Sequence, residues 1–391
     1  MAAASISPEV TTPPAPTSGG ILICLPAMPV DQIDVAVEHL REAFAGQAVS
    51  FAGTSGADSL QYVTPRPQLG WVLGAGDYAA AAGLLQQQQP DVVLLLGADA
   101  TTLPASSLRA LVDMVRTGVD LALPRYPLGP HDGLVSSALL YPLTRTLFTT
   151  DIRFPLPVDA ALSARMLSRL AALANRAIGP AGTESLIWPV AEASVAGFQV
   201  RQVEMPARTL PPPADGDLNS LLAAVAGSFF ADVEAKATYW QRGRVMTAAS
   251  AATSDQSFPS FDTAETASML EAFQLASNNL MELWALVLPP QTLLAVKKLS
   301  RLPAGQFTMD ASLWARIVYD FALAFHARSL NRGHLLGAMT PLYLAWAASY
   351  IHVVGDSSER AARQIESIAQ AFEREKPYFV SRWRWPDRFN P

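Results

Sequence analysis

Three short stretches of the sequence place glycine, proline or acidic residues directly after an expected strand or before an expected helix. Leu25-Pro26-Ala27 follows the apolar run 21–25, Gly97-Ala98-Asp99 follows the run 92–96, and Gly74-Ala75-Gly76-Asp77 opens a helix between them. A carboxylate after a buried strand can hold Mg²⁺ or Mn²⁺ against a diphosphate, and glycines before a helix let backbone N–H groups approach a phosphate. The alternative is that Asp99 caps the next helix and that the glycines only form turns.

The segment from residue 125 to residue 161 is rich in groups that bind anions. Arg125, Arg145 and Arg153 place three guanidinium groups in the same segment as His131, Asp132 and Asp159. Guanidinium groups bind phosphate or carboxylate through two parallel hydrogen bonds. Structural salt bridges would use the same residues, so both interpretations stay open at this point.

Charge and cysteine content exclude several classes of function. The 391 residues carry 28 basic and 34 acidic side chains and a net charge of −6, so we expect neither a nucleic acid nor an anionic membrane surface as partner. Cys24 is the only cysteine, so no disulfide or cysteine-rich zinc site can form within the chain, which suits a cytoplasmic protein.

Familiar catalytic and membrane motifs are missing from the sequence. It has no Walker loop, no G-x-S-x-G elbow and no H-E-x-x-H motif, and its five histidines lack the spacing of metal ligands. No segment is apolar for long enough to predict a transmembrane helix. The sequence therefore predicts a soluble protein.

The elements that must position these residues begin after a Pro-rich tail, 1–18, which we expect to be disordered. Short, continuous apolar runs at 21–25 and 92–96 predict buried strands, and 49–52 and 119–123 are further strand candidates. Apolar stripes at helical spacing lie between them. This alternation predicts an α/β fold: a Rossmann-like, mostly parallel sheet with helices on both faces. Ligands of such sheets bind beyond the carboxyl ends of the strands.

The later part of the chain is helical in pattern. The small, polar stretch 246–262 is the expected linker, and Asp262 and Asp310 have the surroundings of helix N-caps. We therefore predict two domains, an α/β domain over 19–245 and an all-helical domain over 256–391.

Several motifs resemble those of a group of bacterial GT-A-fold glycosyltransferases, the group related to mannosylglycerate synthase and glucosyl-3-phosphoglycerate synthase. In the α/β part the matching stretches are LLLGAD (94–99), Tyr126, Asp132-Gly133, YPLTR (141–145) and IRFPLPVDAA (152–161). In the helical part, LWARIVYDFALAFH (313–326), HLLGAMTPLYL (334–344) and FEREKPYFVSRW (372–383) look like the C-terminal helical domain of that group. The resemblance covers nearly the whole chain after the tail.

The resemblance implies transfer of a sugar from a nucleotide-diphosphate sugar to a small acceptor. It assigns the donor to the strand ends and the helix start, at Leu25, Pro26, Ala27, Gly74, Gly76, Ala98 and Asp99. The loop that faces sugar and acceptor falls on 157–159, so Asp159 would position a hydroxyl group, and Glu184 would assist as a base. Contacts to phosphate or acceptor are expected from Tyr126, His131, Asp132, Arg145 and Arg153.

The chain departs from the group at its metal and phosphate ligands. The group's phosphate-side lysine corresponds to Ala75, the first aspartate of its Asp-x-Asp motif to Gly97, and its metal-binding histidine to Leu210. Asp99 remains at most as a weak ligand of Mg²⁺ or Mn²⁺, so we expect nucleotide binding to depend little on a divalent cation. The alternatives are a metal-independent glycosyltransferase, an enzyme with a shifted donor, and a catalytically silent relative kept for binding or scaffolding.

The matched motifs also predict a polar cluster on one wall of the cleft. Asp132 should pair with the guanidinium of Arg145 or of Arg153 and leave the other for phosphate or an acidic acceptor. The alternative is a closed salt bridge that only fixes the segment in place.

The helical domain should pack on the α/β domain and contribute to a homo-oligomer. Its large apolar side chains, Trp314, Tyr343, Trp346 and Tyr350, exceed what one small helical layer is expected to bury. The alternative is that these side chains form the core of that domain.

Overall fold

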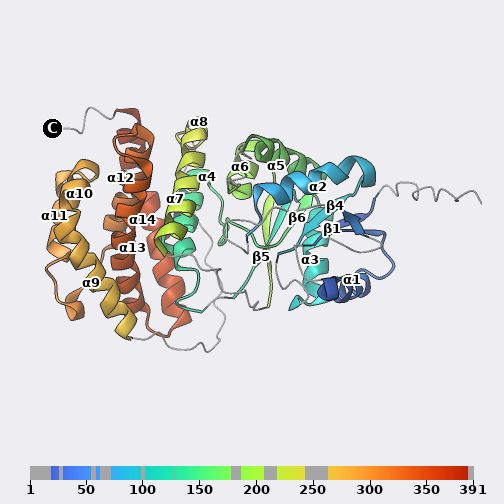
Figure 1. The fold of residues 1–391 in the computed structure, drawn as a ribbon, viewed down its shortest axis with the longest axis horizontal. Coiled ribbons are helices and arrows are strands. Elements are labelled where there is room, and N and C mark those ends of the chain that lie inside the picture. The colour runs from blue at the N-terminus through green and yellow to red at the C-terminus, as the bar shows by residue number, and fades with distance from the viewer. Residues whose placement is uncertain are drawn as a thin grey trace, which may run out of the picture.

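The computed structural model of the chain describes residues 19–25, 30–53, 59–61, 72–97, 102–127, 129–177, 186–206, 218–242 and 263–385. The predicted disordered tail and the predicted linker lie outside these ranges. The described residues form two halves, a sheet flanked by helices and a bundle of helices beside it (Figure 1).

A mixed sheet of seven strands forms the first half of the part of the chain that the structure describes. The strands are β1 (Ile21–Cys24), β2 (Val49–Gly53), β3 (Ser59–Gln61), β4 (Val92–Leu95), β5 (Leu121–Arg125), β6 (Ala160–Ser163) and β7 (Val200–Glu204). Their order is β3-β2-β1-β4-β6-β5-β7, and β6 alone among them runs antiparallel to its neighbours, β4 and β5. The predicted α/β fold with a mostly parallel sheet is confirmed, and the four predicted strands correspond to β1, β2, β4 and β5.

Helices cover both faces of the sheet because its strands are apolar on both sides. On one face, α1 (Val30–Ala43) and α3 (Ala105–Arg116) pack against strand side chains that include Ile23. On the other face, α2 (Ala75–Gln88), α5 (Ala164–Ala177) and α6 (Pro189–Ala196) pack against a set that includes Leu22. Adjacent residues of β1 thus point to opposite faces, as the period of a strand requires.

The second half is helical and draws on more of the chain than the predicted domain 256–391. It comprises a π-helical turn (Ser136–Leu140), α4 (Tyr141–Phe148), α7 (Leu218–Ala235), α8 (Ala237–Trp240), α9 (Thr263–Asn279), α10 (Met281–Val287), α11 (Pro290–Leu299), a 3₁₀ turn (Ala304–Gln306), α12 (Ala311–Ala327), α13 (Arg332–Val354) and α14 (Ser358–Arg384). One apolar core joins α4, α7 and α8 to the C-terminal helices. Part of the predicted 19–245 domain therefore packs within the helical half.

Helix α7 is the one described helix that is long and apolar enough to cross a membrane by length and composition. Core helices of globular proteins pass the same test. In this structure Phe229 and Phe230 of α7 are buried in the core of the helical half.

The predicted cap of α12 is confirmed. The Asp310 carboxylate accepts hydrogen bonds from the N–H groups of Ser312 and Leu313. The α14 stripe, Ala361, Ile365, Ile368 and Phe372, is buried. Asp262, the other predicted cap, lies outside the described residues.

The large aromatic side chains of the helical half are its core and do not form a surface for self-association. Trp314, Tyr343, Trp346 and Tyr350 are each at most 4% exposed. The ring of Trp346 stacks 5.8 Å from that of Trp314 and 5.2 Å from that of Tyr350. The alternative stated for these side chains, that they form the core of the helical part, therefore holds in this structure.

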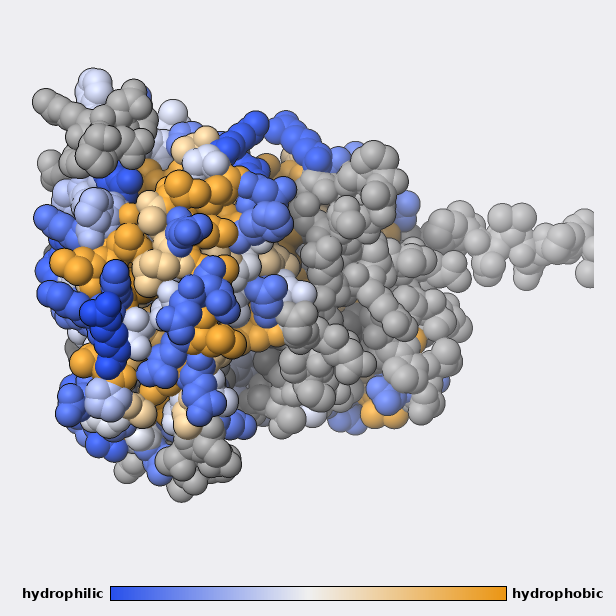
Figure 2. All heavy atoms as spheres, turned by 60° about the vertical axis from the view of Figure 1, so that its left-hand side comes forward, coloured by the Kyte–Doolittle hydropathy of each residue, from blue (hydrophilic) through white to orange (hydrophobic). Residues whose placement is uncertain are grey.

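Exposed apolar side chains instead lie on the outer helices. Leu275 of α9, Leu286 of α10 and Leu294 of α11 are each more than half exposed. On the side of the molecule where these helices lie, Figure 2 shows apolar surface interrupted by hydrophilic side chains. A homo-oligomer through the helical half stays a prediction.

Candidate functional site

The strand order reverses between β1 and β4, and a doubly wound sheet opens a crevice for a ligand at such a point. The two strands end together: Leu96 N–H donates a hydrogen bond to the Cys24 carbonyl oxygen at 3.0 Å. Leu25 and Gly97 therefore follow neighbouring strands at the same edge. The predicted donor contacts that come next in the chain, Pro26, Ala27, Ala98 and Asp99, lie outside the described residues.

Asp159 lies at this edge as well, directly before β6. Its Oδ1 accepts a hydrogen bond from Gly97 N–H at 2.9 Å, and its Oδ2 accepts one from the Tyr126 hydroxyl at 2.5 Å. The pairing of β6 with both β4 and β5 explains why residues from the ends of all three strands meet here. The carboxylate is 0% exposed, so in this structure it holds protein groups in place. Its predicted contact with a substrate hydroxyl stays a prediction.

The start of α2 is tied to the same edge. Leu73 N–H donates a hydrogen bond to the Pro157 carbonyl oxygen at 2.9 Å, which fixes Gly74 and the first turn of the helix beside the 157–159 loop. Gly76, the second glycine predicted at the phosphate, is buried in that turn. The structure therefore brings together the β1 end, the β4 end, the α2 start and the 157–159 loop.

Asp77 closes the first turn of α2. Its Oδ2 accepts a hydrogen bond from Gly74 N–H at 2.8 Å. Burial raises the pKa of Asp77 to about 6, although this hydrogen bond acts in the opposite direction. An acid at this place is half-neutralised near pH 6, which weakens its repulsion of a bound phosphate.

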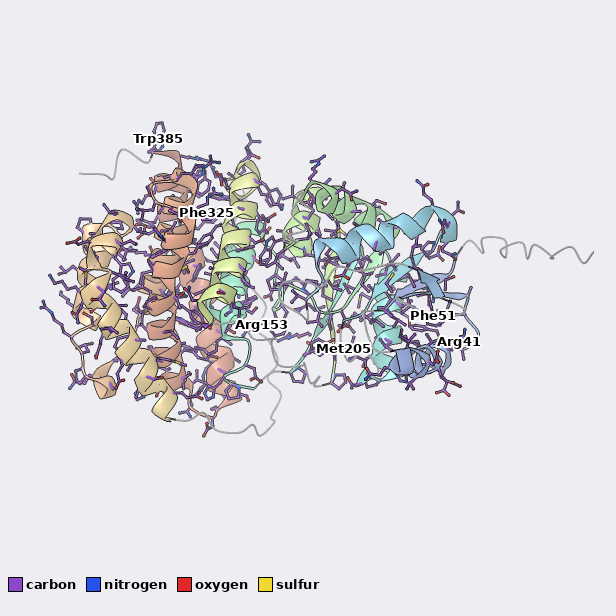
Figure 3. The ribbon with its side chains drawn as sticks, viewed as in Figure 1. Arg41, Phe51, Arg153, Met205, Phe325 and Trp385 are labelled. Carbon is purple, nitrogen blue, oxygen red and sulfur yellow. The ribbon has the colours of Figure 1, made fainter. Side chains whose placement is uncertain are left out.

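Arg153 lies at the junction of the two halves (Figure 3). Its guanidinium carbon is 4.7 Å from the centroid of the Tyr141 ring, and its Nη2 is 3.5 Å from Ser137 Oγ. Burial lowers the pKa of Arg153, and the neighbouring charge of Arg125 acts in the same direction. Within the described ranges no carboxylate forms an ion pair with Arg153, so this cation is suited to an anionic ligand.

Arg145 does not lie in the polar cluster that was predicted for one wall of the cleft. It is 1% exposed and makes a bidentate pair with Glu366, with Nη1 to Oε2 at 2.6 Å and Nη2 to Oε1 at 3.0 Å. Its Nε donates a further hydrogen bond to Glu373 Oε1 at 2.9 Å. The predicted cluster of Arg145 with Asp132 is therefore wrong, because two glutamates of α14 bind the guanidinium inside the helical half.

The turn before α4 carries the other predicted contacts. Asp132 Oδ2 accepts a hydrogen bond from Gly129 N–H at 3.0 Å, and its side chain is exposed. The Tyr350 hydroxyl donates to the Pro130 carbonyl oxygen at 3.1 Å, so α13 holds this turn, with His131 in it, against the helical half. Glu184, the predicted base, lies outside the described residues.

The described residues contain no group of three or more His, Cys, Asp or Glu that could hold a metal ion. The sequence did not indicate Glu366 and Glu373, which bind Arg145 and keep it out of the site, nor the packing of Val158 on Gly97. Only Val158 had a usable signal, since it stands in the 157–159 loop that the sequence assigns to sugar and acceptor.

No family model matches the sequence, and no curated protein matches it significantly. The solved structures similar to it include complexes of glucosyl-3-phosphoglycerate synthase from Mycobacterium tuberculosis. The complex with phosphoglyceric acid is 15% identical with a TM-score of 0.35, over 55% of this chain and 79% of that chain. The complex with Mg²⁺ and uridine diphosphate is 14% identical with a TM-score of 0.36, over 62% and 84%. The complex with Mn²⁺ and uridine-diphosphate-glucose is 15% identical with a TM-score of 0.36, over 62% and 84%. TM-scores this low establish neither a fold family nor a function.

Proposed function

We propose that this protein is a glycosyltransferase of the GT-A type that moves a sugar from a nucleoside diphosphate sugar to a small acceptor. The observation that carries the proposal is the reversal of strand order between β1 and β4, with the α2 start and the 157–159 loop fixed at the same edge. A crevice of this kind is where doubly wound sheets bind nucleotides. The matched stretches YPLTR and IRFPLPVDAA support a sugar donor in particular.

In the proposed complex the donor follows the carboxyl edge. Leu25, Pro26 and Ala27 face the nucleobase and ribose, and the α2 start with Gly74 and Gly76 faces the diphosphate. Ala98 and Asp99 would contribute further contacts to the nucleotide sugar. Backbone N–H groups at the start of a helix are suited to phosphate oxygens, which makes α2 the natural partner of the diphosphate.

The proposed acceptor side lies toward the helical half. Arg153, with Tyr126, His131 and Asp132 on neighbouring segments, would hold an acceptor that carries an anionic group, because Arg153 has no carboxylate partner among the described residues. Glu184 would serve as the base that removes the proton of the acceptor hydroxyl. The proposed transfer uses no divalent cation, so basic side chains must stabilise the leaving diphosphate.

A catalytically silent nucleotide-binding protein is the second candidate function. The observation that favours it is the full burial of the Asp159 carboxylate, which is hydrogen-bonded at both oxygens and faces no solvent. Such a protein would bind a nucleotide in the crevice but would not catalyse sugar transfer.

Calorimetric titration with a panel of nucleoside diphosphate sugars that includes uridine-diphosphate-glucose tests the shared part of both candidates. We expect saturable binding of at least one member at one site per chain. Gly76→Asp should weaken it, because it places a second acid at the α2 start, whereas Gly83→Asp on the same helix is the matched control, since a Cβ at Gly83 meets nothing within 4 Å. No binding to any member would refute the nucleotide site.

An assay for released nucleoside diphosphate then separates the two candidates. Small acids such as phosphoglyceric acid serve as trial acceptors. Acceptor-dependent release that falls in Arg153→Ala supports the transferase, whereas tight binding with no release across the panel supports the silent protein.

A further inference from the structure

Gly97 is packed tightly against the 157–159 loop at the carboxyl edge. A Cβ placed on Gly97 would lie 2.6 Å from Val158 Cγ1 and 2.7 Å from the Val158 carbonyl oxygen. Both distances are well below the separation of atoms in contact, so even alanine at this position requires the 157–159 loop to move. No side chain of any kind, and no carboxylate in particular, fits at residue 97 while Val158 is in place.

The next residue of the loop is fixed just as firmly. Asp159 accepts hydrogen bonds at both carboxylate oxygens, from Gly97 N–H and from the Tyr126 hydroxyl, and is 0% exposed. A metal ion bound there would have to displace both donors and open a fully buried site. Displacement would also leave the Gly97 N–H buried without an acceptor, which is costly.

Val158 and Asp159 thus act together on the end of β4. We name the contact set Gly97, Tyr126, Val158 and Asp159 the β4 clasp. Through Pro157, whose carbonyl oxygen accepts from Leu73 N–H at 2.9 Å, the β4 clasp also holds the start of α2. The loop is therefore attached to β4, to the residue after β5 and to α2 at once.

A divalent cation that bridges diphosphate and protein at this edge needs oxygen ligands that face the ligand. Gly97 and Asp159 do not fit such an ion, because position 97 has no room for a carboxylate and the carboxylate at 159 is turned into the protein. The geometry points to a specific exclusion: the β4 clasp leaves no place for a divalent cation at residues 97 and 159, and Gly97 and Val158 each require the other. This deepens the proposed function by stating what its nucleotide site rejects, and its biological consequence rests on that function.

A thermal-unfolding cycle tests the dependence between the two positions. Gly97→Ala should lower the melting temperature by roughly 2–6 °C, as expected for overpacking in a large domain. In a Val158→Gly background the same substitution should cost clearly less, because the Cγ1 is gone and a glycine lets the carbonyl move aside.

Gly83→Ala is the matched control for this cycle. Gly83 lies in α2, where a Cβ meets nothing within 4 Å, so alanine there should leave the melting temperature unchanged or raise it. An unchanged melting temperature for Gly97→Ala, or an equal loss in both backgrounds, would overturn the dependence of Gly97 on Val158.

Electron paramagnetic resonance of Mn²⁺, with the metal alone and with uridine diphosphate added, tests the exclusion itself. We expect no saturable site that involves Asp159 in the wild-type protein up to millimolar metal. A saturable site that disappears in Asp159→Asn would overturn the inference, whereas one that persists in this variant lies elsewhere and leaves the exclusion standing. If uridine diphosphate does not bind, the proposed function is weakened, but the melting cycle and the metal-only titration still decide the inference.

Discussion

Two arginines from one short segment, Arg145 and Arg153, end in opposite surroundings. Arg145 is enclosed in the helical half, and two glutamates bind its guanidinium. Arg153 lies at the junction of the halves over the Tyr141 ring, and none of the described carboxylates pairs with it. A buried charge that is fully paired stabilises packing, whereas one that lacks a counter-charge is available to a ligand.

The pKa shifts of Arg145 and Arg153 run in opposite directions, because Arg145 has carboxylate partners and Arg153 has none among the described residues. Burial alone would lower the pKa of Arg145, but its hydrogen bonds to Glu366, Tyr141 and Glu373 outweigh burial and raise the pKa. Burial also lowers the pKa of Arg153, and there no strong pair reverses it. The same side chain therefore serves structure at one position and, in our proposal, binding at the other.

The largest expected effect is the loss of stability in Arg145→Ala. Removal of the guanidinium leaves Glu366 and Glu373 close together without a cation, and Glu373 is only 10% exposed. We expect the free energy of unfolding to fall by about 3 kcal/mol, the lower end for a broken buried pair, because Glu366 is partly exposed. Urea denaturation measures the loss. If this variant were as stable as the wild type, the structural role that we assign to Arg145 would be wrong.

The second expected effect concerns binding. Arg153→Ala should weaken binding of uridine-diphosphate-glucose or phosphoglyceric acid about tenfold, the loss of one charge-assisted contact, with little change in melting temperature. Calorimetry on the folded variant measures it. Arg165→Ala is the control, since Arg165 also lies over an aromatic ring, that of Phe198, but pairs with Asp120. A sharp fall in melting temperature with unchanged affinity would make Arg153 structural as well.

The surroundings of Arg145 and Arg153 could not be predicted from the sequence. The segment that contains them was identified from its composition alone, but the sequence alone could not distinguish binding from salt bridges. Glu366 lies 221 residues from Arg145 in the chain, and no motif in the sequence around either residue predicts that they pair. It arises because α14 packs along α4, which is a property of the folded helical half.

The positions of the main strands could be predicted from the sequence more easily than the division of the helices between the two halves. Continuous apolar runs identify β1 and β4, because a strand that is buried on both faces carries apolar side chains at successive positions. The short strands β3 and β6 carry no such signal, and the antiparallel pairing of β6 with β4 and β5 is seen only in the folded sheet. The predicted domain boundaries stay a prediction. Helices α4 and α7 lie within the predicted 19–245 domain and share a core with the C-terminal helices, because they are apolar enough to join either half and only packing decides between them.

The smallest expected effect extends the comparison from cations to acids. Glu366, which is paired with Arg145, has its pKa lowered chiefly by that hydrogen bond. Asp77 has no described cation beside it, and burial raises its pKa from an ordinary 3.8 to about 6. Between these two pH values the folded protein holds a proton that the unfolded chain has lost, so the contribution of Asp77 to stability decreases as the pH rises through this range.

Asp77→Asn should remove this contribution. The variant should be more stable than the wild type near neutral pH, because the amide keeps an oxygen for Gly74 N–H and carries no charge to bury. Melting temperatures measured from about pH 5 to about pH 7 should rise toward acid less steeply in Asp77→Asn than in the wild type. Burial also raises the pKa of Asp232 to about 6 and that of Asp320 to about 7, so both proteins keep some slope and only their difference reports on Asp77. Parallel curves for the two proteins would mean that Asp77 is already compensated, and the contrast between paired and unpaired charges would then hold for the arginines alone.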